Sequence, residues 1–372
     1  MKITSEINSP KRPNPTTDPV SFTRMAVGLI ILVITGFVFW VGFRFLRDTT
    51  APQVITAIIA IIWGVGGVAA LFTGANMLVE SFSATWQRRI QPYIFIGPAV
   101  AMLGWFLFVP TLRTLYQSFF NADTTSFVGL DNYIATFTDR QMLESYRNNL
   151  IWLILGTGAC VTLGLLVAVL ADRSKFETLA KALIFMPMAI SFVGAGVIFK
   201  FIYTANAEGE AQIGLLNAIV VGLGGTPQTW LSSAQPWNNL FLIIVLIWMQ
   251  TGFSMVIFSS ALKSVPDDLL EAARIDGANE VDIFFKIIIP YIKGTIVTVT
   301  TTIAIFTLKI FDVVSVMTGG NFGTDVVATQ FFRQYSVANN YGYGSAIAMV
   351  LFLAVVPVMI YNIRQLRNQE AF

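Results

Sequence analysis

Few side chains in this sequence could carry out acid-base, redox or metal chemistry. The chain has no histidine, which removes the commonest general base and metal ligand, and its single cysteine, Cys160, lies within an apolar run. The sequence also lacks the G-x-x-x-x-G-K-[S/T] pattern of a nucleotide-binding P-loop. We therefore expect no enzyme activity, no catalytic residue, no metal site and no cofactor held by this chain itself.

The most distinctive polar residues lie in one segment, residues 263–293, between two long apolar runs. Ser264 can cap a short helix that has Pro266 in its first turn. Asp267 and Asp268 would stabilise the positive N-terminal end of that helix. The pattern predicts a first short helix in this segment.

The second half of the same segment predicts another short helix. Gly277 permits a sharp bend, and the second helix would start near Asn279 and end before Pro290, because proline disfavours helix in the residue before it. Two short helices joined at a glycine form a compact knob suited to a groove on a partner. The alternative is an ordinary polar hairpin between two membrane spans.

The elements that flank this segment are apolar enough to cross a membrane. The chain is 55% hydrophobic and only 12% charged, with a mean hydropathy of +0.70, whereas soluble domains are about 25% charged. We therefore expect an all-α, polytopic membrane protein with about eight transmembrane helices. The predicted spans are residues 24–43, 53–79, 92–118, 149–171, 179–203, 238–262, 293–315 and 343–363.

The polar termini and the basic residues predict the topology. Residues 1–21 are expected to form a disordered cytoplasmic tail rather than a cleaved signal, since the first apolar run begins late. Most of the 23 Lys and Arg residues lie on the inner side if both termini are cytoplasmic. The same rule places residues 263–293 in the cytoplasm. The net charge of +2 is too small to indicate a nucleic-acid partner, so the lipid bilayer is the expected environment.

The spacing within residues 263–293 resembles the EAA motif of binding-protein-dependent ABC importer permeases. Glu271-Ala272-Ala273 is followed by Gly277 and then by Ile287-x-Ile289-Pro290. In that family this coupling helix region docks the ATPase subunit. The resemblance implies that the coupling residues are Glu271, Ala272, Ala273, Asp276, Gly277, Ile287 and Pro290.

Other segments are similar to carbohydrate-type permeases related to the larger membrane subunit of the maltose transporter, over roughly residues 90–364. They are residues 108–119, the "F-x-G-L-x-N-Y" segment at 127–133, Phe311-Asp312 and residues 317–320, with a weaker similarity to α-glucoside and glucosylglycerol permeases at 87–98. This resemblance implies two extra N-terminal transmembrane helices at 22–91 and a six-helix core at 92–372. The chain lacks that subunit's large periplasmic insertion, and its longest expected external loops are 121–148 and 203–237.

The resemblance also implies a function and a set of partners. The chain would translocate a small sugar or sugar-derived solute, of the oligosaccharide, α-glucoside or glucosylglycerol type, delivered by an extracytoplasmic solute-binding protein. A second permease subunit would complete a heterodimer in the bacterial plasma (inner) membrane, and two copies of an ATPase subunit would bind ATP and Mg²⁺. The alternative from another class is an autonomous ion-coupled secondary transporter.

Six residues on the helices either side of the coupling loop occupy positions that the maltose permease uses for its sugar. They are Met249, Gln250, Phe253, Phe306, Thr307 and Ile310. Aromatic faces stack on sugar rings, while Gln and Thr form hydrogen bonds with hydroxyl groups in an apolar cavity. Ordinary helix packing explains the same residues equally well.

Two further patterns have a structural and a functional interpretation. Lys309 and Asp312 lie three residues apart, so they can pair on one helix face near the external end of a span; a ligand or ion-relay role is the less favoured reading. Residues 64–69 fit the dinucleotide pattern G-x-G-x-x-A but lie inside an apolar span. Close helix packing explains them better.

Overall fold

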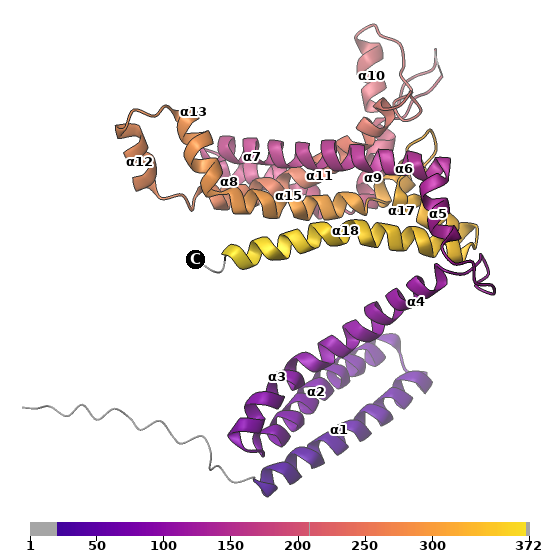
Figure 1. The fold of residues 1–372 in the computed structure, drawn as a ribbon, viewed down its shortest axis with the longest axis vertical. Coiled ribbons are helices and arrows are strands. Elements are labelled where there is room, and N and C mark those ends of the chain that lie inside the picture. Colours follow the sequence, from indigo (N-terminus) through magenta and orange to yellow (C-terminus); the bar gives the residue numbers. More distant parts are fainter. Residues whose placement is uncertain (1–20, 208, 370–372) are drawn as a thin grey trace, which may run out of the picture. The chain divides into compact units, whose positions relative to one another are not determined.

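The computed structural model describes residues 21–207 and 209–369 and is built from helices (Figure 1). Within these residues the only strand-like feature is an isolated bridge between Phe120 and Phe127. The all-α prediction is thus confirmed. The chain divides into two compact units, of which the first ends at Thr111 and the second begins at Leu112. Most of the predicted tail lies outside the described residues, and the predicted domain boundary at 91/92 stays a prediction.

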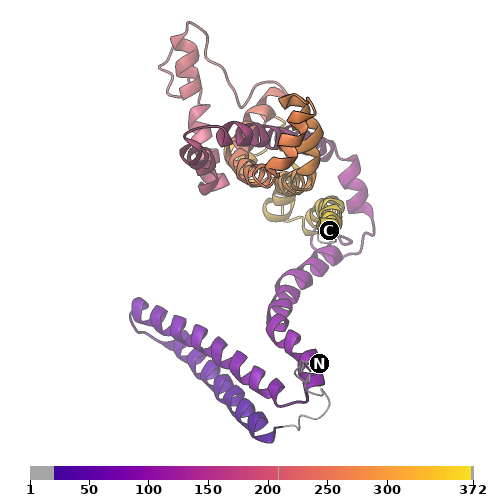
Figure 2. The same cartoon turned by 90° about the vertical axis from the view of Figure 1, so that its left-hand side faces the viewer.

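The first unit is a hairpin of two long helices followed by a third. These are α1 (Phe22–Asp48), α2 (Gln53–Glu80) and α3 (Ala84–Leu103). The third helix continues through the π-helical turn η1 (Gly104–Phe108) into α4 (Val109–Gln117), which crosses the boundary between the two units. Figure 2 shows α1 and α2 running side by side. A Cβ added to Gly67 would lie 2.6 Å from the Phe39 ring, and one added to Gly74 would lie 2.9 Å from Ile31. Within residues 64–69, Gly67 therefore packs closely against α1, as the helix-packing interpretation predicts, whereas a Cβ added to Gly64 or Gly66 would meet nothing within 4 Å.

The second unit contains the remaining elements, arranged around α11 (Trp237–Leu262). Before α11 come α5 (Asp131–Thr138), α6 (Arg140–Ile151), the π-helical turn η2 (Trp152–Thr157), α7 (Gly158–Asp172), α8 (Glu177–Phe185), the 3₁₀ turn η3 (Met186–Ala189), α9 (Phe192–Ile202) and α10 (Leu215–Gly222). After it come α12 (Asp267–Ile275), α13 (Glu280–Ile283), the π-helical turn η4 (Phe284–Ile288), α14 (Ile289–Tyr291), α15 (Lys293–Leu308), α16 (Asp312–Met317), α17 (Val327–Phe332), the π-helical turn η5 (Arg333–Val337) and α18 (Tyr341–Gln369).

The α11 helix is the centre of this unit because its neighbours approach it closely. A Cβ on Gly164 of α7 would lie 2.3 Å from the Cβ of Ser254, and a Cβ on Gly252 would lie 2.4 Å from the Ile184 carbonyl oxygen. Small residues permit such backbone approach between membrane helices. Thirteen residues of α11 are buried, among them Leu246 and Phe258.

The described residues contain seven helices long and apolar enough to span a membrane, or eight if one bent pair counts as a span. The bent pair corrects the predicted straight span at 179–203: Glu177–Ala189 and Phe192–Ile202 meet at 99°. Pro187 lies in a 3₁₀ turn, Ile190 is extended, and the Ser191 side chain caps α9 by accepting a hydrogen bond from the Gly194 N–H (3.0 Å). A capped helix start inside the apolar run ends one helix and begins another.

Two spans begin earlier than predicted. The helix predicted from residue 92 begins at Ala84, and the one predicted from 149 begins at Arg140. The residues in between include charged side chains, which predict a loop, but a helix can extend beyond the apolar run, and at α6 a cap stabilises this start. Asp139 caps α6 in this way, accepting hydrogen bonds from the N–H groups of Gln141 (2.8 Å) and Met142 (3.0 Å).

Candidate coupling loop and solute site

The first short helix of the polar segment ends in a Schellman motif. Gly277 has φ +86°, its N–H donates to the Arg274 carbonyl (3.1 Å), and the Ala278 N–H donates to the Ala273 carbonyl (3.0 Å). These two bonds satisfy carbonyls that the end of α12 would otherwise leave free. Gly277 is required here because only glycine adopts this backbone conformation without strain.

The start of α12 differs from the prediction. Pro266 occupies the N-cap position, and the Ser264 hydroxyl instead donates to the Ala261 carbonyl (2.7 Å). Ser264 therefore closes the end of α11 rather than opening α12, because a serine hydroxyl near a helix end can reach back to a carbonyl. Asp267 and Asp268 do lie in the first turn of α12.

The second short helix starts as predicted and ends later. Asn279 caps α13 through its side-chain oxygen, which accepts from the Asp282 N–H (2.9 Å). The chain then continues through η4 into α14, with Pro290 inside α14, so the predicted end before Pro290 is wrong. In η4 the Ile289 N–H donates to the Phe284 carbonyl, five residues back. A π-helical turn widens the backbone just where proline lacks its N–H and its ring would crowd a carbonyl.

The predicted coupling residues present a mostly exposed surface. Glu271, Ala272, Asp276, Gly277 and Pro290 are exposed, and Ile287 is half-buried. Ala273 is the exception. It is buried, so it supports α12 from inside while its neighbours face outward. Figure 1 shows α12 and α13 at one end of the second unit.

Ion pairs connect the two short helices to each other and to α7. Arg274 Nε lies 2.9 Å from Glu280 Oε1, and Arg173 Nη2 lies 3.9 Å from Glu280 Oε2. The hydrogen bond from Arg274 lowers the pKa of Glu280 below its ordinary value. All three side chains are exposed, so the pairs orient the loop more than they stabilise it.

A charged cluster at the base of the loop was missed by the sequence analysis. Lys181 of α8 forms ion pairs with Asp172 and Glu177, and Lys263 at the end of α11 also pairs with Glu177. The Ser259 hydroxyl donates to Asp172 Oδ1 (2.7 Å). The sequence feature that indicates this cluster is the presence of opposite charges at the ends of three neighbouring spans. The cluster fixes the ends of α7, α8 and α11 relative to one another.

The predicted solute residues differ in their surroundings. Met249, Thr307 and Ile310 are buried, Phe253 is half-buried against the same apolar cluster, and Phe306 is 48% exposed. The Thr307 hydroxyl donates to the Ile303 carbonyl (2.8 Å) and accepts from the Thr157 hydroxyl (3.3 Å). Thr307 is thus engaged in helix packing.

Gln250 differs from Thr307 because its amide is unused. The residue is only 5% exposed, and its backbone carbonyl accepts a hydrogen bond from the Ser254 hydroxyl (3.3 Å). Its side chain makes no hydrogen bond to any residue that the structure describes. Among the six predicted solute residues, Gln250 is therefore the one with polar capacity to spare.

The predicted ion pair between Lys309 and Asp312 is wrong. The α15 helix ends at Leu308, α16 begins at Asp312, and no ion pair joins the two side chains in the part of the chain that the structure describes. Because the helix is interrupted between them, the three-residue spacing no longer places both residues on one face.

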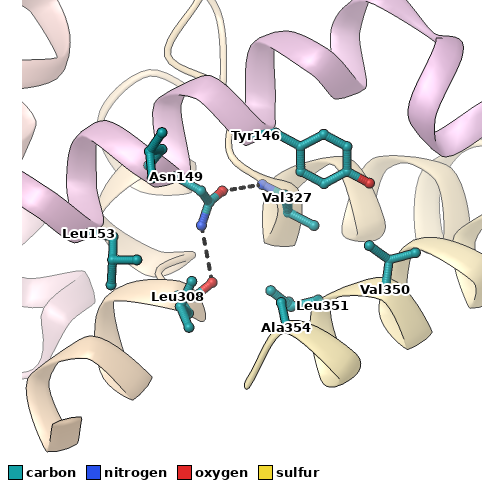
Figure 3. Close-up of a pocket in the computed structure, with 9 residues that line it drawn as sticks. Tyr146, Asn149, Leu153, Leu308, Val327, Val350, Leu351 and Ala354 are labelled. Atoms are coloured by element: carbon teal, nitrogen blue, oxygen red, sulfur yellow. Dashed lines mark hydrogen bonds between the residues drawn. The ribbon is translucent and has the colours of Figure 1, made fainter. Parts of the chain in front are cut away.

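Asn149 explains this interruption. Its Nδ2 donates to the Leu308 carbonyl (3.1 Å), and its Oδ1 accepts from the Val327 N–H (2.8 Å), as Figure 3 shows. One amide thus satisfies the last carbonyl of α15 and the first N–H of α17. It borders a cavity of about 170 Å³ whose other walls, such as Leu153 and Leu351, are apolar.

A second group of amides holds the loop between α16 and α17. Asn148 Nδ2 donates to the carbonyls of Gly323 and Asp325 (both 2.7 Å), and Asn238 Nδ2 donates to the Phe322 carbonyl (2.6 Å). Phe322 has φ +59°, a strained conformation for a bulky residue. The dipeptides Asn148-Asn149 and Asn238-Asn239, at the ends of two apolar runs, were the sequence signal for this network.

The Asp325 carboxylate closes the same loop. It accepts hydrogen bonds from Thr329 Oγ1, Gln330 Nε2 (2.7 Å) and Arg333 Nη1 (2.6 Å), and the Asp325 side chain is 8% exposed. Burial raises the pKa of Asp325 above its ordinary value, although the Thr329 hydrogen bond and the Arg333 charge act in the opposite direction. The ionised carboxylate therefore depends on its three donors.

Two residues of the segment 127–133, Asn132 and Tyr133, have a structural role. Asn132 Nδ2 donates to the carbonyls of Ser118 (2.9 Å) and Phe120 (2.7 Å), and the Tyr133 hydroxyl lies 2.6 Å from Ser118 Oγ. These bonds satisfy carbonyls at the end of the long helix that includes α4. The motif therefore fastens α5 to that helix end.

A bundle of spanning helices with an exposed pair of short helices between two spans defines a membrane permease of the ABC importer type. The chain belongs to the family described as "Binding-protein-dependent transport system inner membrane component", which matches residues 160–368. It is a transmembrane permease subunit of an ABC importer and a multi-pass membrane protein.

Named relatives match this chain over most of its length. It is 52% identical over 277 residues to the osmoprotective compounds uptake permease protein GgtC of Synechocystis sp., covering 74% of this chain and 99% of that protein. It is 45% identical over 332 residues to the alpha-glucoside transport system permease protein AglF of Rhizobium meliloti, covering 86% and 98%. These relatives are transport permeases, which indicates a role without catalysis, and they give no support to the ion-coupled alternative.

The fold matches a solved importer. A chain from the crystal structure of a bacterial ABC transporter involved in the import of the acidic polysaccharide alginate aligns with a TM-score of 0.65 at 20% identity, covering 76% of this chain and 96% of that one. At this identity the likeness shows the fold alone.

Proposed function

We propose that this chain is one half of a heterodimeric permease that passes a small sugar or sugar-derived solute, of the oligosaccharide, α-glucoside or glucosylglycerol type, across the bacterial inner membrane. One observation carries the solute class: the relatives named for uptake of osmoprotective compounds and for α-glucoside transport match along nearly their whole length. A solute-binding protein delivers the solute from outside. Both termini lie in the cytoplasm.

The exposed face of α12 and α13 is the docking element for the ATPase. Two ATPase copies bind ATP and Mg²⁺, and their closure moves one short helix pair on each permease subunit. In this chain Glu271, Ala272, Asp276 and Gly277 contact the ATPase, while Ala273 supports them from the buried side. The charged cluster around Lys181 carries the motion to α7, α8 and α11.

Affinity purification of the tagged full chain from mild detergent tests the assembly. We expect mass spectrometry to find a second permease, an ATPase and a solute-binding protein, and the solute bound to that last protein identifies the substrate. Recovery of the folded chain alone, with uptake that requires an ion gradient and not ATP, contradicts the proposal.

Gln250 is the residue of this chain that we propose binds the solute by hydrogen bonding. The near-isosteric change Gln250→Met is expected to lower uptake at limiting solute about 5- to 150-fold, since a buried polar group of the solute left without its partner costs about 1–3 kcal/mol. Uptake is measured across solute concentrations, together with the ATPase activity of the assembled complex without solute.

The matched control is the neighbouring change Thr251→Val, because the Thr251 hydroxyl is already bonded to the Ile247 carbonyl (2.6 Å). It should leave the concentration dependence of uptake unchanged. Equal losses in the two variants would assign Gln250 to helix packing instead.

A further inference from the structure

Three arginines gather at one end of the α1/α2 hairpin. The Ser21 N–H donates to the Ser81 carbonyl (3.0 Å), which joins the start of α1 to the turn between α2 and α3. Arg24 lies in the first turn of α1, and Arg88 and Arg89 lie in the second turn of α3. All three side chains are exposed, and none forms an ion pair with any residue in 21–207 or 209–369.

The opposite end of α1 shows how this hairpin normally accommodates arginine. Arg47 Nε lies 2.7 Å from Asp48 Oδ1, and the Arg44 guanidinium lies 5.2 Å from the centre of the Trp40 ring. Both cations there have an internal partner. At the three-arginine end, within the residues that the structure describes, Glu80 accepts a hydrogen bond from Asn76 Nδ2 (2.8 Å) and forms no ion pair.

Arg88 and Arg89 line a hollow of about 350 Å³ together with Ala84 and Thr85. The arginines follow those two residues by one helical turn, and helical side chains lean toward the N-terminus, so both guanidinium groups border the first turn of α3. That turn contains no acidic residue, and Ser83 makes no capping hydrogen bond. Two cations therefore lie next to the positive end of a helix dipole. These positive charges repel one another unless an anion lies between them.

The surroundings indicate the depth of this hollow in the bilayer. Trp86 is 57% exposed and Tyr93 is 76% exposed on the same helix, and these two residue types favour the boundary between hydrocarbon and water. Phospholipid phosphates lie at that depth. A guanidinium group can donate two parallel hydrogen bonds to the oxygens of one phosphate. The hollow has room for one phosphate group.

We propose that the hollow at Ala84, Thr85, Arg88 and Arg89 binds the phosphate of an anionic phospholipid of the phosphatidylglycerol type, with Arg24 adding to its charge. The site belongs to the first unit alone. It anchors the turn between α2 and α3 at the membrane surface, and its occupancy does not depend on which solute the permease carries.

The test measures lipid binding to the purified full-length chain by native mass spectrometry, with phosphatidylglycerol and phosphatidylcholine of the same acyl chains. The double variant Arg88→Gln/Arg89→Gln is expected to bind phosphatidylglycerol about 25-fold more weakly, roughly fivefold for each arginine. Arg88→Lys/Arg89→Lys should keep most of the binding, and added salt should weaken it.

The matched control removes the same charge from the other end of the hairpin, as Arg44→Gln/Arg47→Gln. It should leave phosphatidylglycerol binding within twofold of the unaltered chain. Equal binding of the two lipids, or equal losses in the two double variants, would overturn the proposal. Displacement of the lipid by millimolar inorganic phosphate would also overturn it, since the site would then be one for free phosphate.

Discussion

Replacing Gly277 with valine is expected to abolish solute uptake while the chain still inserts into the membrane. Gly277 has φ +86°, and nothing lies within 4 Å of where a Cβ would be, so the change introduces backbone strain and no clash. A left-handed conformation costs an L-residue about 1–2 kcal/mol, and more for a β-branched one. Because α12 has little buried surface, it can relieve this strain by unwinding its last turn. That turn carries the residues proposed to contact the ATPase.

The chain offers a matched control in Gly224. It has φ +85° and also has open space around its Cβ position. The end of α10 has the same pair of hydrogen bonds, from the Gly224 N–H to the Val221 carbonyl and from the Gly225 N–H to the Val220 carbonyl (both 2.9 Å). Gly224→Val should therefore impose the same strain without loss of coupling. Uptake, ATPase activity of the complex and the amount of chain in the membrane fraction are measured for both. Normal uptake by Gly277→Val would show that the loop does not couple the ATPase to transport.

Asn148→Leu is expected to destabilise the second unit by about 1–3 kcal/mol. Asn148 is fully buried, and its amide is bonded to the carbonyls of Gly323 and Asp325. Leucine has a similar size but leaves the Asp325 carbonyl without this donor, whereas the Gly323 carbonyl still accepts from Gln235 Nε2 (2.5 Å). One buried, unsatisfied group costs about 1–3 kcal/mol. The expected result is a lower midpoint of thermal unfolding for the purified chain in detergent.

Asn321→Leu provides the comparison. Asn321 lies in the same loop, is exposed, and makes one local hydrogen bond through its amide, to the Thr318 carbonyl (2.9 Å). Its replacement should change the unfolding midpoint little. If both variants unfold at the same temperature, the buried amide does not hold the loop as the hydrogen bonds indicate.

The sequence predicted those features that depend on local composition. Long apolar runs identified the spans because an apolar segment of sufficient length has few other stable environments. Gly277 and Asn279 were found because helix ends have strong residue preferences. In both cases the cause lies within a few residues of the feature.

Two features that were not predicted have the opposite cause, since they depend on partners far away in sequence, whereas the continuation through Pro290 has a local cause. At the helix break between Lys309 and Asp312, the free Leu308 carbonyl accepts a hydrogen bond from Asn149, which lies about 160 residues earlier in the sequence. No local pattern could show this. The continuation through Pro290 depends on a π-helical turn that absorbs the missing N–H. The ends of α7, α8 and α11 meet in an ion cluster that becomes visible only when the helices are packed.

The π-helical turn at Trp152–Thr157 has a consequence for how this chain can vary. A π turn contains one residue more than an α turn, so it offsets the helix before it from the helix after it by about 100°. Asn148 and Asn149 thus face the loop between α16 and α17 and the end of α15, while Gly164, on the other side of the turn, faces α11. Loss of a single residue within this turn would rotate one face against the other and break every contact on one side. A substitution in this span changes the contacts of one side chain. An insertion or deletion shifts the register of all the contacts on one side of the turn.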